Sequence, residues 1–395
     1  MRVAMIAPPW LALPITGYGG IELVLEGLID GLREQGVEVE LFGNGAHRMH
    51  GVKTHSLYKT EQFQHIHRPY YDTAPIVQAH VTFALNKIRQ DGKFDIIHDH
   101  NTIIGPSLLA SASQLPGVPP VLHTFHGPPF NDSTKQTKDS INGSAYLEQL
   151  RDMGNMYMVA ISHAMTKTAP TAIKTHLLKS VHNAVEIEHF PFKEKKKDYF
   201  ITLARFTKDK SQAVAAKFAA QQKQKLKMAG TVAGIGNKSK LTLELLNPLS
   251  EYRGNQEFRY YSDNILKYTI KHPRTIMYVG NVGGERKLNL ISNAKALLFP
   301  IDWEEPFGMA VIEALACGTP VVAMRRGAMP EIIEHGVTGF LADTEAEFGE
   351  YMKRVGEIDP VACRAAVEKR FGSTTMANSY IERYEEVIRR SAENN

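Results

Sequence analysis

The chain has 395 residues, of which 43% are hydrophobic and 22% are charged, and its formal net charge is +4. This composition is typical of a globular protein, and the length predicts two domains instead of a single core. The positive charge is too small to argue for a nucleic-acid-binding protein. The only two cysteines, Cys317 and Cys363, share no CxxC spacing, so the sequence indicates neither a disulfide framework nor a zinc site.

The chain begins with a strand-like segment, Arg2–Ala7, and no basic stretch followed by a long apolar one, so we expect no signal peptide. No apolar run approaches the ~20 residues that a membrane-spanning helix needs. We therefore expect a cytoplasmic protein. The basic run Lys193–Lys197 is interpreted as a solvated linker, and peripheral contact with anionic lipid at the inner membrane face is the alternative.

Short apolar segments alternate with amphipathic ones in the first half of the chain. A helical pattern runs from Ile21 to Gln35, and Gly36 is a typical helix stop. Apolar strands without in–out alternation are typical of a parallel sheet that helices cover on both faces. The predicted strands are Val3–Ala7, Val37–Phe42, Ile96–His98, Val121–Phe125 and Met158–Ile161.

The alternation breaks at a charged segment, Glu186–Asp198, which we interpret as a domain linker, and it resumes until a charged helix at Met376–Arg390. The sequence therefore predicts an α/β protein with two doubly wound parallel-sheet domains. Ligands bind beyond the carboxyl ends of such strands, so we expect a site in a cleft between the two sheets. The predicted strands of the second half are Phe200–Leu203, Lys227–Ala229, Ile276–Val279, Ala296–Phe299 and Val321–Ala323.

Three glycines, Gly17, Gly19 and Gly20, stand between the first strand and the first helix. Glycines at such a place let a phosphate approach the free N–H groups and the positive end of the helix. The dinucleotide fingerprint GxGxxG is not met, because Glu22 stands where the last glycine belongs. The pattern fits a phosphate-binding loop and a plain helix-starting turn equally well.

Histidines mark the ends of two predicted strands in the first half. The spacing of His98 and His100 places both on one strand face. No carboxylate-plus-histidine triad follows from this spacing, so we expect no metal site. His126, with Gly127 behind it, ends its strand at the edge where ligands bind, which favours a binding or catalytic role over a purely structural one.

Charged residues follow two strands of the second half. Arg205 and Lys210 suit a diphosphate, since one offers a planar fork and the other a point charge, but surface cations are common and the pair alone is unspecific. Glu305 lies in a predicted loop, and Glu313 lies one or two turns into the helix that follows. Carboxylates accept hydrogen bonds from pairs of sugar hydroxyls. The N–H groups of residues 307–309 lie between them, at the positive end of the helix.

The segment Glu305–Pro320, followed by Gly327, Pro330–Ile332 and Gly336–Phe340, resembles the retaining family 4 glycosyltransferases of the GT-B fold. Other landmarks of that family occur in the same order, so the resemblance covers nearly the whole chain. These landmarks are Gly19–Glu22, Thr124–Gly127, His182–Val185 and the pair Arg205 and Lys210. The chain departs from the family pattern at Ala184, Ala204, Ile301 and Ala328–Met329, and none of these is a proposed ligand.

The resemblance implies an acceptor-side domain over residues 1–188, a donor-binding domain over residues 199–375 and a last helix, residues 376–395, that crosses back to the first domain. It also implies the role of each site residue. Arg205 and Lys210 would bind the donor diphosphate, Glu313 would bind the ribose, and Val282 would contact the base. The transferred sugar would be bound by Glu305 and by the backbone of Phe307, Gly308 and Met309. The catalytic residues would be His126, at the reacting centre, and Glu305. Gly19 and Gly20 would lie near the phosphates, and the acceptor would be contacted by Tyr18, Asp99 and Asn101.

The implied reaction transfers a hexose from a nucleotide-diphosphate sugar to a hydroxyl acceptor, with retention of configuration and without a metal or other cofactor. UDP-glucose is the favoured donor and GDP-mannose the next. A small alcohol, a saccharide and a lipid-linked acceptor all stay open, as does the oligomeric state, and no nucleic-acid partner is expected. The alternatives are a non-hydrolysing nucleotide-sugar epimerase and a non-catalytic nucleotide-sugar-binding protein.

Overall fold

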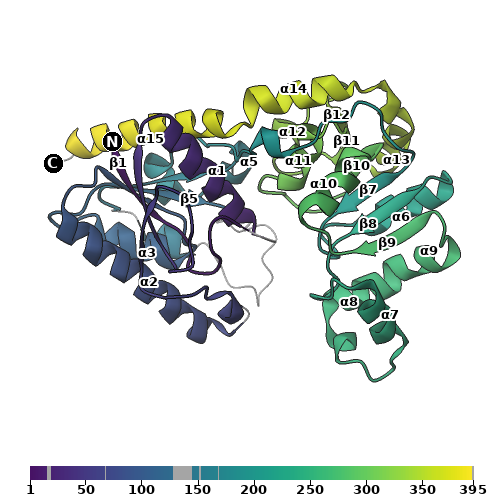
Figure 1. Cartoon of the computed structure of the whole chain (residues 1–395), viewed down its shortest axis with the longest axis horizontal. Helices are drawn as coiled ribbons and strands as arrows, with labels where there is room; N and C mark the ends of the chain where they lie inside the picture. The colour runs from purple at the N-terminus through teal and green to yellow at the C-terminus, as the bar shows by residue number, and fades with distance from the viewer. Residues whose placement is uncertain (16–18, 67, 128–144, 151–152, 168, 394–395) are drawn as a thin grey trace. The chain divides into compact units, whose positions relative to one another are not determined.

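The computed structural model describes residues 1–15, 19–66, 68–127, 145–150, 153–167 and 169–393. The chain divides into two compact units (Figure 1). Unit 1 consists of residues 1–185 and 372–395, and unit 2 consists of residues 186–371. Tyr18, one of the predicted acceptor contacts, lies outside the described residues.

Unit 1 contains a six-stranded parallel sheet in the order β3-β2-β1-β4-β5-β6. The first strand lies in the middle of the sheet, and the chain then builds outward in one direction and later in the other. This is the doubly wound order, in which the direction of winding reverses between β1 and β4. The strands are β1 Arg2–Ile6, β2 Glu38–Gly43, β3 Lys53–Ser56, β4 Ile96–Asp99, β5 Val121–Phe125 and β6 Met156–Ala160.

The helices of unit 1 cover its sheet in two groups. One group packs α1 against α15, and the other packs α2 against α3 (Figure 1). The helix α15 comes from the end of the chain, after unit 2, and so returns the chain to unit 1. The helices are α1 Gly20–Glu34, η1 Phe63–His65, α2 Tyr70–Asp91, α3 Ile104–Ala112, α4 Ala145–Glu148, α5 His163–Thr166, η3 Thr171–His176 and α15 Ser373–Glu393.

Unit 2 repeats the same topology with six parallel strands in the order β12-β11-β10-β7-β8-β9. Its direction of winding reverses between β7 and β10. The strands are β7 Phe200–Leu203, β8 Leu226–Ala229, β9 Ile276–Gly280, β10 Ala296–Phe299, β11 Val321–Met324 and β12 Gly339–Ala342. The helices are η4 Ile187–His189, α6 Gln212–Gln221, α7 Lys238–Leu246, η5 Glu251–Gly254, α8 Gln256–Tyr260, η6 Tyr261–Ile265, α9 Leu266–Lys271, α10 Gly284–Ser292, α11 Met309–Ala316, α12 Met329–Ile332, α13 Glu345–Arg354, η7 Val355–Glu357 and α14 Pro360–Arg370.

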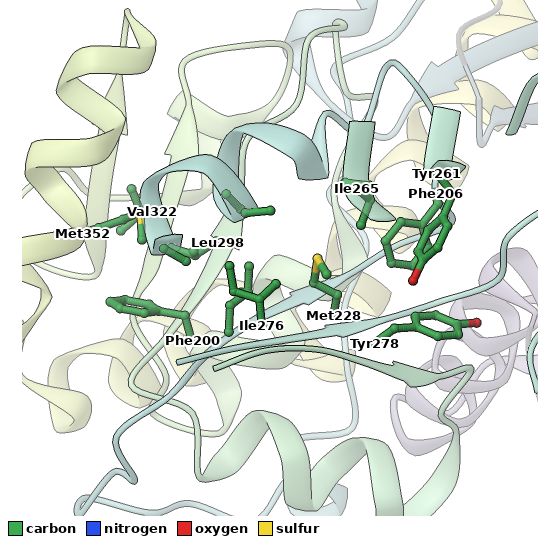
Figure 2. Close-up of a cluster of buried hydrophobic side chains, with 14 of the residues drawn as sticks. Phe200, Phe206, Met228, Tyr261, Ile265, Ile276, Tyr278, Leu298, Val322 and Met352 are labelled. Carbon is green, nitrogen blue, oxygen red and sulfur yellow. The ribbon is translucent and has the colours of Figure 1, made fainter. Parts of the chain in front are cut away.

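A hydrophobic core fills the space between the sheet of unit 2 and the helices α6, α8, η6 and α13 (Figure 2). Strand side chains such as Phe200 and Leu298 face Met352 of α13 there. Full burial of one such side chain stabilises the fold by about 1.5–3 kcal/mol. At the other end of the cluster, Phe206 packs edge-on against the rings of Tyr261 and Tyr278. The loop that follows β7 is therefore fixed by the packing of Phe206 against these two rings.

All ten predicted strands exist, with ends that differ by at most two residues, but β3 and β12 were not predicted. Both are edge strands of four residues. The sequence of β3, KTHS, is polar because its side chains pair with a neighbouring strand: Lys53 and His55 both contact the buried carboxylate of Glu40. Hydrophobic patterning has no signal for a strand that is held by charges.

The linker differs from the prediction at one residue, because Lys196 is not a solvated side chain. Its ammonium group donates to the carbonyl oxygens of Ser292 and Cys317 and to the hydroxyl of Thr319, at 2.9–3.0 Å. Burial lowers the pKa of Lys196 to about 8. This side chain fastens the segment before β7 to the body of unit 2.

The close contact between α1 and α15 makes a test of the returning helix. A Cβ on Gly31 of α1 would lie 2.8 Å from the carbonyl oxygen of Ser373 and 3.0 Å from the Cβ of Ala377. We predict that Gly31→Ala destabilises unit 1 by about 1–3 kcal/mol through overpacking, although alanine favours helices. The midpoint of urea unfolding measures it. Gly356→Ala, where a Cβ would meet nothing within 4 Å, is the control that should leave the midpoint unchanged.

Candidate functional site

The loops after β7 and β10 lie side by side, because these two strands are neighbours at the point where the winding of unit 2 reverses. A hydrogen bond of 2.7 Å from the N–H of Asp302 to the carbonyl oxygen of Asp209 joins the two loops directly. In open α/β sheets the edge beyond two such strands is the usual place for a ligand, and we call this pair of loops the crevice of unit 2. Four predicted site residues lie on these loops or on the helix that follows, namely Arg205, Lys210, Glu305 and Glu313.

The centre of this crevice is an ion pair between Lys210 and Glu305, with 2.5 Å between Nζ and Oε2. The same carboxylate oxygen accepts a hydrogen bond of 2.9 Å from the indole of Trp303. The ammonium group also lies 4.5 Å from the centre of the Trp303 ring, within the range of a cation–π interaction. Both charged side chains are largely buried. One carboxylate thus holds a lysine and an indole N–H in a fixed position.

The backbone around Glu305 is held in place by the turn before α12. The N–H of Ala328 donates to the carbonyl oxygen of Glu305 at 2.9 Å, and the N–H of Gly327 donates to the side chain of Glu304. A Cβ on Gly327 would lie 2.2 Å from the carbonyl oxygen of Glu305. Only glycine allows this approach, which explains why the motif needs a glycine at that position.

The helix α11 begins between the two glutamates. Gly308 stands before it in the left-handed region, with φ of 98°, and no side chain caps the first turn. Its first N–H groups are therefore free to donate to a ligand at the positive end of the helix. Phe307 is buried and packs edge-on against Phe371, while Met309 is the first residue of the helix. The predicted backbone contacts from residues 307–309 therefore lie at one helix start.

Glu313 lies in the middle of α11, and its carboxylate is buried. Lys287 of α10 donates to it at 2.8 Å. This contact gives the buried carboxylate a charged partner. The pair leaves acceptor positions on the second carboxylate oxygen, which suits a hydroxyl donor such as ribose.

Arg205 extends from the end of β7, and its side chain is 60% exposed. Its guanidinium donates to Glu257 of α8 at 3.0 Å. The other oxygen of Glu257 accepts from the N–H of Ala233, so this carboxylate is fixed by the loop after β8. The two predicted diphosphate-binding cations thus have separate partners in this structure, Glu257 for Arg205 and Glu305 for Lys210.

The loop after β9 carries Val282, the residue predicted to lie at the donor base. Its side chain is buried, and Gly280 before it takes a φ of 83°. An open pocket of about 400 Å³ lies along β9, between the loop before α7 and the side chain of Arg286. Its lining residues are Gly236, Asn237, Lys238, Ser239, Met277, Tyr278, Val279, Gly280 and Arg286. Val282 itself is not part of this lining.

In unit 1, Gly19 and Gly20 stand at the start of α1, and no side chain caps this helix end. Among the residues that the structure describes, none apart from its chain neighbours and its own helix lies within 4 Å of the place that a Cβ on Gly20 would take. A Cβ on Gly19 would come within 2.8 Å of the side chain of Glu22. Burial raises the pKa of Glu22, and its carboxyl group occupies part of the space beside the helix start.

His126 follows β5 and forms a hydrogen-bonded pair with His100, with 2.7 Å between Nε2 of His126 and Nδ1 of His100. The other nitrogen of His100 lies 3.0 Å from the sulfur of Met5, which can only accept, so this nitrogen carries the proton. Neutral His100 then accepts from His126. In a neutral ring this leaves Nδ1 of His126 as a hydrogen-bond acceptor. Sequence spacing alone could not have shown this.

His100 is buried and His126 is half-buried, and the two rings lie close to one another. Burial, followed by the nearby His123, lowers the pKa of His126 to about 3. Burial, followed by the nearby histidines, holds the pKa of His100 and of His98 well below the usual value. His98 is fixed further by Tyr384 of α15, with 2.7 Å between Nδ1 and the phenol oxygen. The helix α15 therefore helps to fix the position of the His98 ring.

Asp99 and Asn101, two of the predicted acceptor contacts, are buried inside unit 1. Asp99 accepts hydrogen bonds from the backbone and side chain of Asn101 and is 2.7 Å from Nδ1 of His123. Their contribution to acceptor binding would therefore act through the position of neighbouring groups. Among the residues that the structure describes, no group of three or more His, Cys, Asp or Glu side chains could hold a metal ion.

The partners of the predicted residues were missed by the sequence analysis. Lys287 and Glu257 belong to helices without a recognisable motif, and they are 26 and 52 residues away from the side chains that they hold. Trp303, which donates to Glu305, was not among the predicted site residues either. One sequence pattern could have identified Lys287 as a candidate site residue: a charged residue in the first turn of a helix that follows a strand, at the edge of the sheet where ligands bind.

The neutral histidines make stability depend on pH. The folded-state pKa of His126 is about 3, below the unfolded value of ~6.5, so only the unfolded chain binds this proton in between. We predict that the melting temperature falls as the pH drops from about 6.5 towards 3. The variant His126→Asn should show a shallower fall, whereas the exposed His50→Asn should keep the full slope. Equal slopes in all three proteins would contradict buried neutral histidines.

Sequence models of two families match the two halves of the chain. The family described as Glycosyltransferase Family 4 matches residues 18–189, and the family described as Glycosyl transferases group 1 matches residues 185–367. An uncharacterized glycosyltransferase of Methanocaldococcus jannaschii is 22% identical over 349 residues, which are 86% of this chain and 84% of the relative. The D-inositol 3-phosphate glycosyltransferase of Paenarthrobacter aurescens is 24% identical over 82% of this chain and 81% of its own length.

Solved structures show the same architecture at low sequence identity. Sucrose-phosphate synthase from Thermosynechococcus elongatus superimposes with a TM-score of 0.72 at 18% identity, over 98% of each chain. HepE from Anabaena, solved in complex with UDP and glucose, gives a TM-score of 0.65 at 16% identity, over 98% of this chain and all of that one. These likenesses confirm the predicted fold class, two Rossmann-like α/β domains of the GT-B type.

Proposed function

Because the chain belongs to the family 4 glycosyltransferases of the GT-B fold, we propose that it transfers a hexose from a nucleotide-diphosphate sugar to a hydroxyl acceptor, with retention of configuration. UDP-glucose is the proposed donor, with GDP-mannose next. The complex of HepE with UDP and glucose supports uridine for a relative of the same fold. The same proposal includes a hydroxyl acceptor, a reaction that needs no metal ion and a location in the cytoplasm.

The observation that carries this proposal is the crevice of unit 2. Two carboxylates, Glu305 and Glu313, flank an uncapped helix start, and each is held by one lysine. Carboxylates bind sugar hydroxyls, and free N–H groups with cations bind phosphate oxygens. A nucleotide-diphosphate sugar has groups of these kinds, with ribose and hexose on either side of the diphosphate.

We assign the leaving group to the cations of this crevice. Arg205 is exposed and can exchange its bond with Glu257 for phosphate oxygens, since a charge-assisted bond to phosphate is at least as strong. Lys210 is already fixed by Glu305 and Trp303. Fixed positive charges stabilise the negative charge that develops on the diphosphate as the glycosidic bond breaks. These groups would do the work that a metal ion does elsewhere.

Retention follows if the acceptor hydroxyl attacks from the face that the diphosphate leaves. The bond from the anomeric carbon to the phosphate oxygen breaks, the bond to the acceptor oxygen forms, and a phosphate oxygen takes the acceptor proton. No carboxylate on the opposite face is needed, unlike in retaining glycosidases. In unit 1, Nδ1 of His126 is an acceptor and suits a hydroxyl of the transferred sugar.

The test is release of nucleotide from a panel of UDP-, GDP- and ADP-sugars, with chelator present and without acceptor. We predict slow release from one donor, UDP-glucose first, at a rate that added chelator leaves unchanged. Complete, metal-reversible loss of release would contradict the metal-free assignment. Thermal stabilisation by a donor without any release would identify a nucleotide-sugar-binding protein, and neither effect with any donor would overturn the proposal.

The ribose assignment predicts the outcome of Glu313→Gln. A charge-assisted hydrogen bond contributes about 1.5–3 kcal/mol, so the donor KM should rise about 10–100-fold with little change in kcat, because the contact exists before and during the reaction. Glu345→Gln is the matched control, since this glutamate also accepts a 2.8 Å bond from a lysine, Lys217, but on the surface. An effect of Glu313→Gln on kcat alone would refute the ribose role.

A further inference from the structure

The helix α7 of unit 2 buries one of its leucines and exposes others. Leu241 is 1% exposed and belongs to the hydrophobic core. Leu243 and Leu246 of the same helix are 67% and 75% exposed, and Leu249 just beyond its end is 90% exposed. Leu243 and Leu246 are three residues apart and are therefore neighbours on the surface of α7, and Leu249 follows three residues beyond the end of the helix. We call these three residues the leucine ridge.

Cations surround the leucine ridge. Arg253 donates to the carbonyl oxygens of Leu245 and Asn247, so its guanidinium lies at the carboxyl end of α7. Lys240 stands one turn before the first ridge leucine, with its ammonium group 5.8 Å from the ring centre of Tyr252. Leucines with cations beside them combine an apolar surface with positive charge.

The whole helical segment from Lys238 to Arg274 shares this charge. It holds seven basic and four acidic residues, a formal charge of +3 in a chain whose net charge is +4. Two of the four acids are bound to other groups and partly buried, Glu244 by Ser250 and Glu257 by Arg205. The exposed cations are Lys238, Lys240, Arg253, Arg259, Lys267, Lys271 and Arg274, and the exposed acids are Glu251 and Asp263.

We propose that the leucine ridge and its cations dock unit 2 on an anionic lipid surface. Exposed apolar side chains that gather on a rim of charge mark an interaction surface. Leucines insert into the region between headgroups and acyl chains, and each nearby lysine or arginine adds about 1 kcal/mol on an anionic leaflet. Lys240 and Arg253, which lie beside the ridge, and the net positive charge of residues 238–274 complement such a surface.

This surface differs from the basic run Lys193–Lys197, for which the sequence left a lipid site open. In that run Lys196 is turned inward onto three oxygen acceptors. No leucine of the ridge takes part in the crevice between β7 and β10, so docking does not depend on the proposed function. No helix of the described residues is long and apolar enough to cross a membrane, and the ridge would only lie on its surface.

The test is co-sedimentation of the full chain with vesicles of phosphatidylcholine alone and of phosphatidylcholine with phosphatidylglycerol. We predict binding to the anionic vesicles that weakens at high salt, and little binding to the neutral ones. The triple variant Leu243→Ser, Leu246→Ser, Leu249→Ser should bind about tenfold more weakly or worse, because it loses the inserted apolar area. The double variant Lys240→Glu, Arg253→Glu should bind anionic vesicles more weakly and should bind neutral vesicles as the parent chain does.

Leu115→Ser, an exposed leucine of unit 1, is the matched control that should bind as the parent chain does. Melting temperatures show whether each variant is folded, and since all three ridge leucines are exposed we expect them unchanged. Absence of binding to anionic vesicles, or binding that the triple variant keeps, would overturn the proposal. A concentration-dependent dimer that the triple variant dissociates, without vesicle binding, would assign the ridge to self-association and would overturn it as well.

Discussion

The position of the first strand in each sheet is the constraint on which the rest of the structure depends. Because β1 and β7 lie in the middle, the winding reverses beside them, and the loops after β1 and β4, and after β7 and β10, become neighbours. Segments nearly 100 residues apart then share one edge. In unit 2 this brings Lys210 to Glu305, and in unit 1 it brings the carbonyl oxygen of Ile6 to Asn101. The same topology thus joins two charged side chains in one unit and an amide side chain to a backbone carbonyl oxygen in the other.

Burial gives these two edges opposite electrostatic character. Lys210 and Lys287 donate to the carboxylates of unit 2, Glu305 and Glu313. In unit 1, the rings of His98, His100 and His126 contact one another, the hydroxyls of Tyr384 and Thr124 and the sulfur of Met5, and burial lowers the pKa of all three. The predicted site residues of unit 2 are therefore charged, whereas Nδ1 of His126 in unit 1 is an acceptor on a neutral ring.

The sequence predicted the strands and the site loops because both depend on local patterns. Ten strands were visible as apolar runs, and Glu305 and Glu313 were visible within a specific motif. The polar edge strand β3 and the inward turn of Lys196 were not, since each is stabilised by partners far along the chain. Lys287 and Glu257 were missed for the same reason. Long-range pairs between side chains leave no periodic signal, so the strands could be predicted while the partners of Glu313 and Arg205 could not.

Hydrogen–deuterium exchange of the full chain with and without UDP-glucose tests whether the crevice between β7 and β10 holds the donor. We predict slower exchange in residues 203–212 and 303–313, because the bound donor would shield the backbone amides of the loops and of the start of α11 from water. Residues 238–274, which carry the leucine ridge, should exchange at the same rate in both states. A donor that raises the melting temperature yet protects neither of the first two segments would contradict the account.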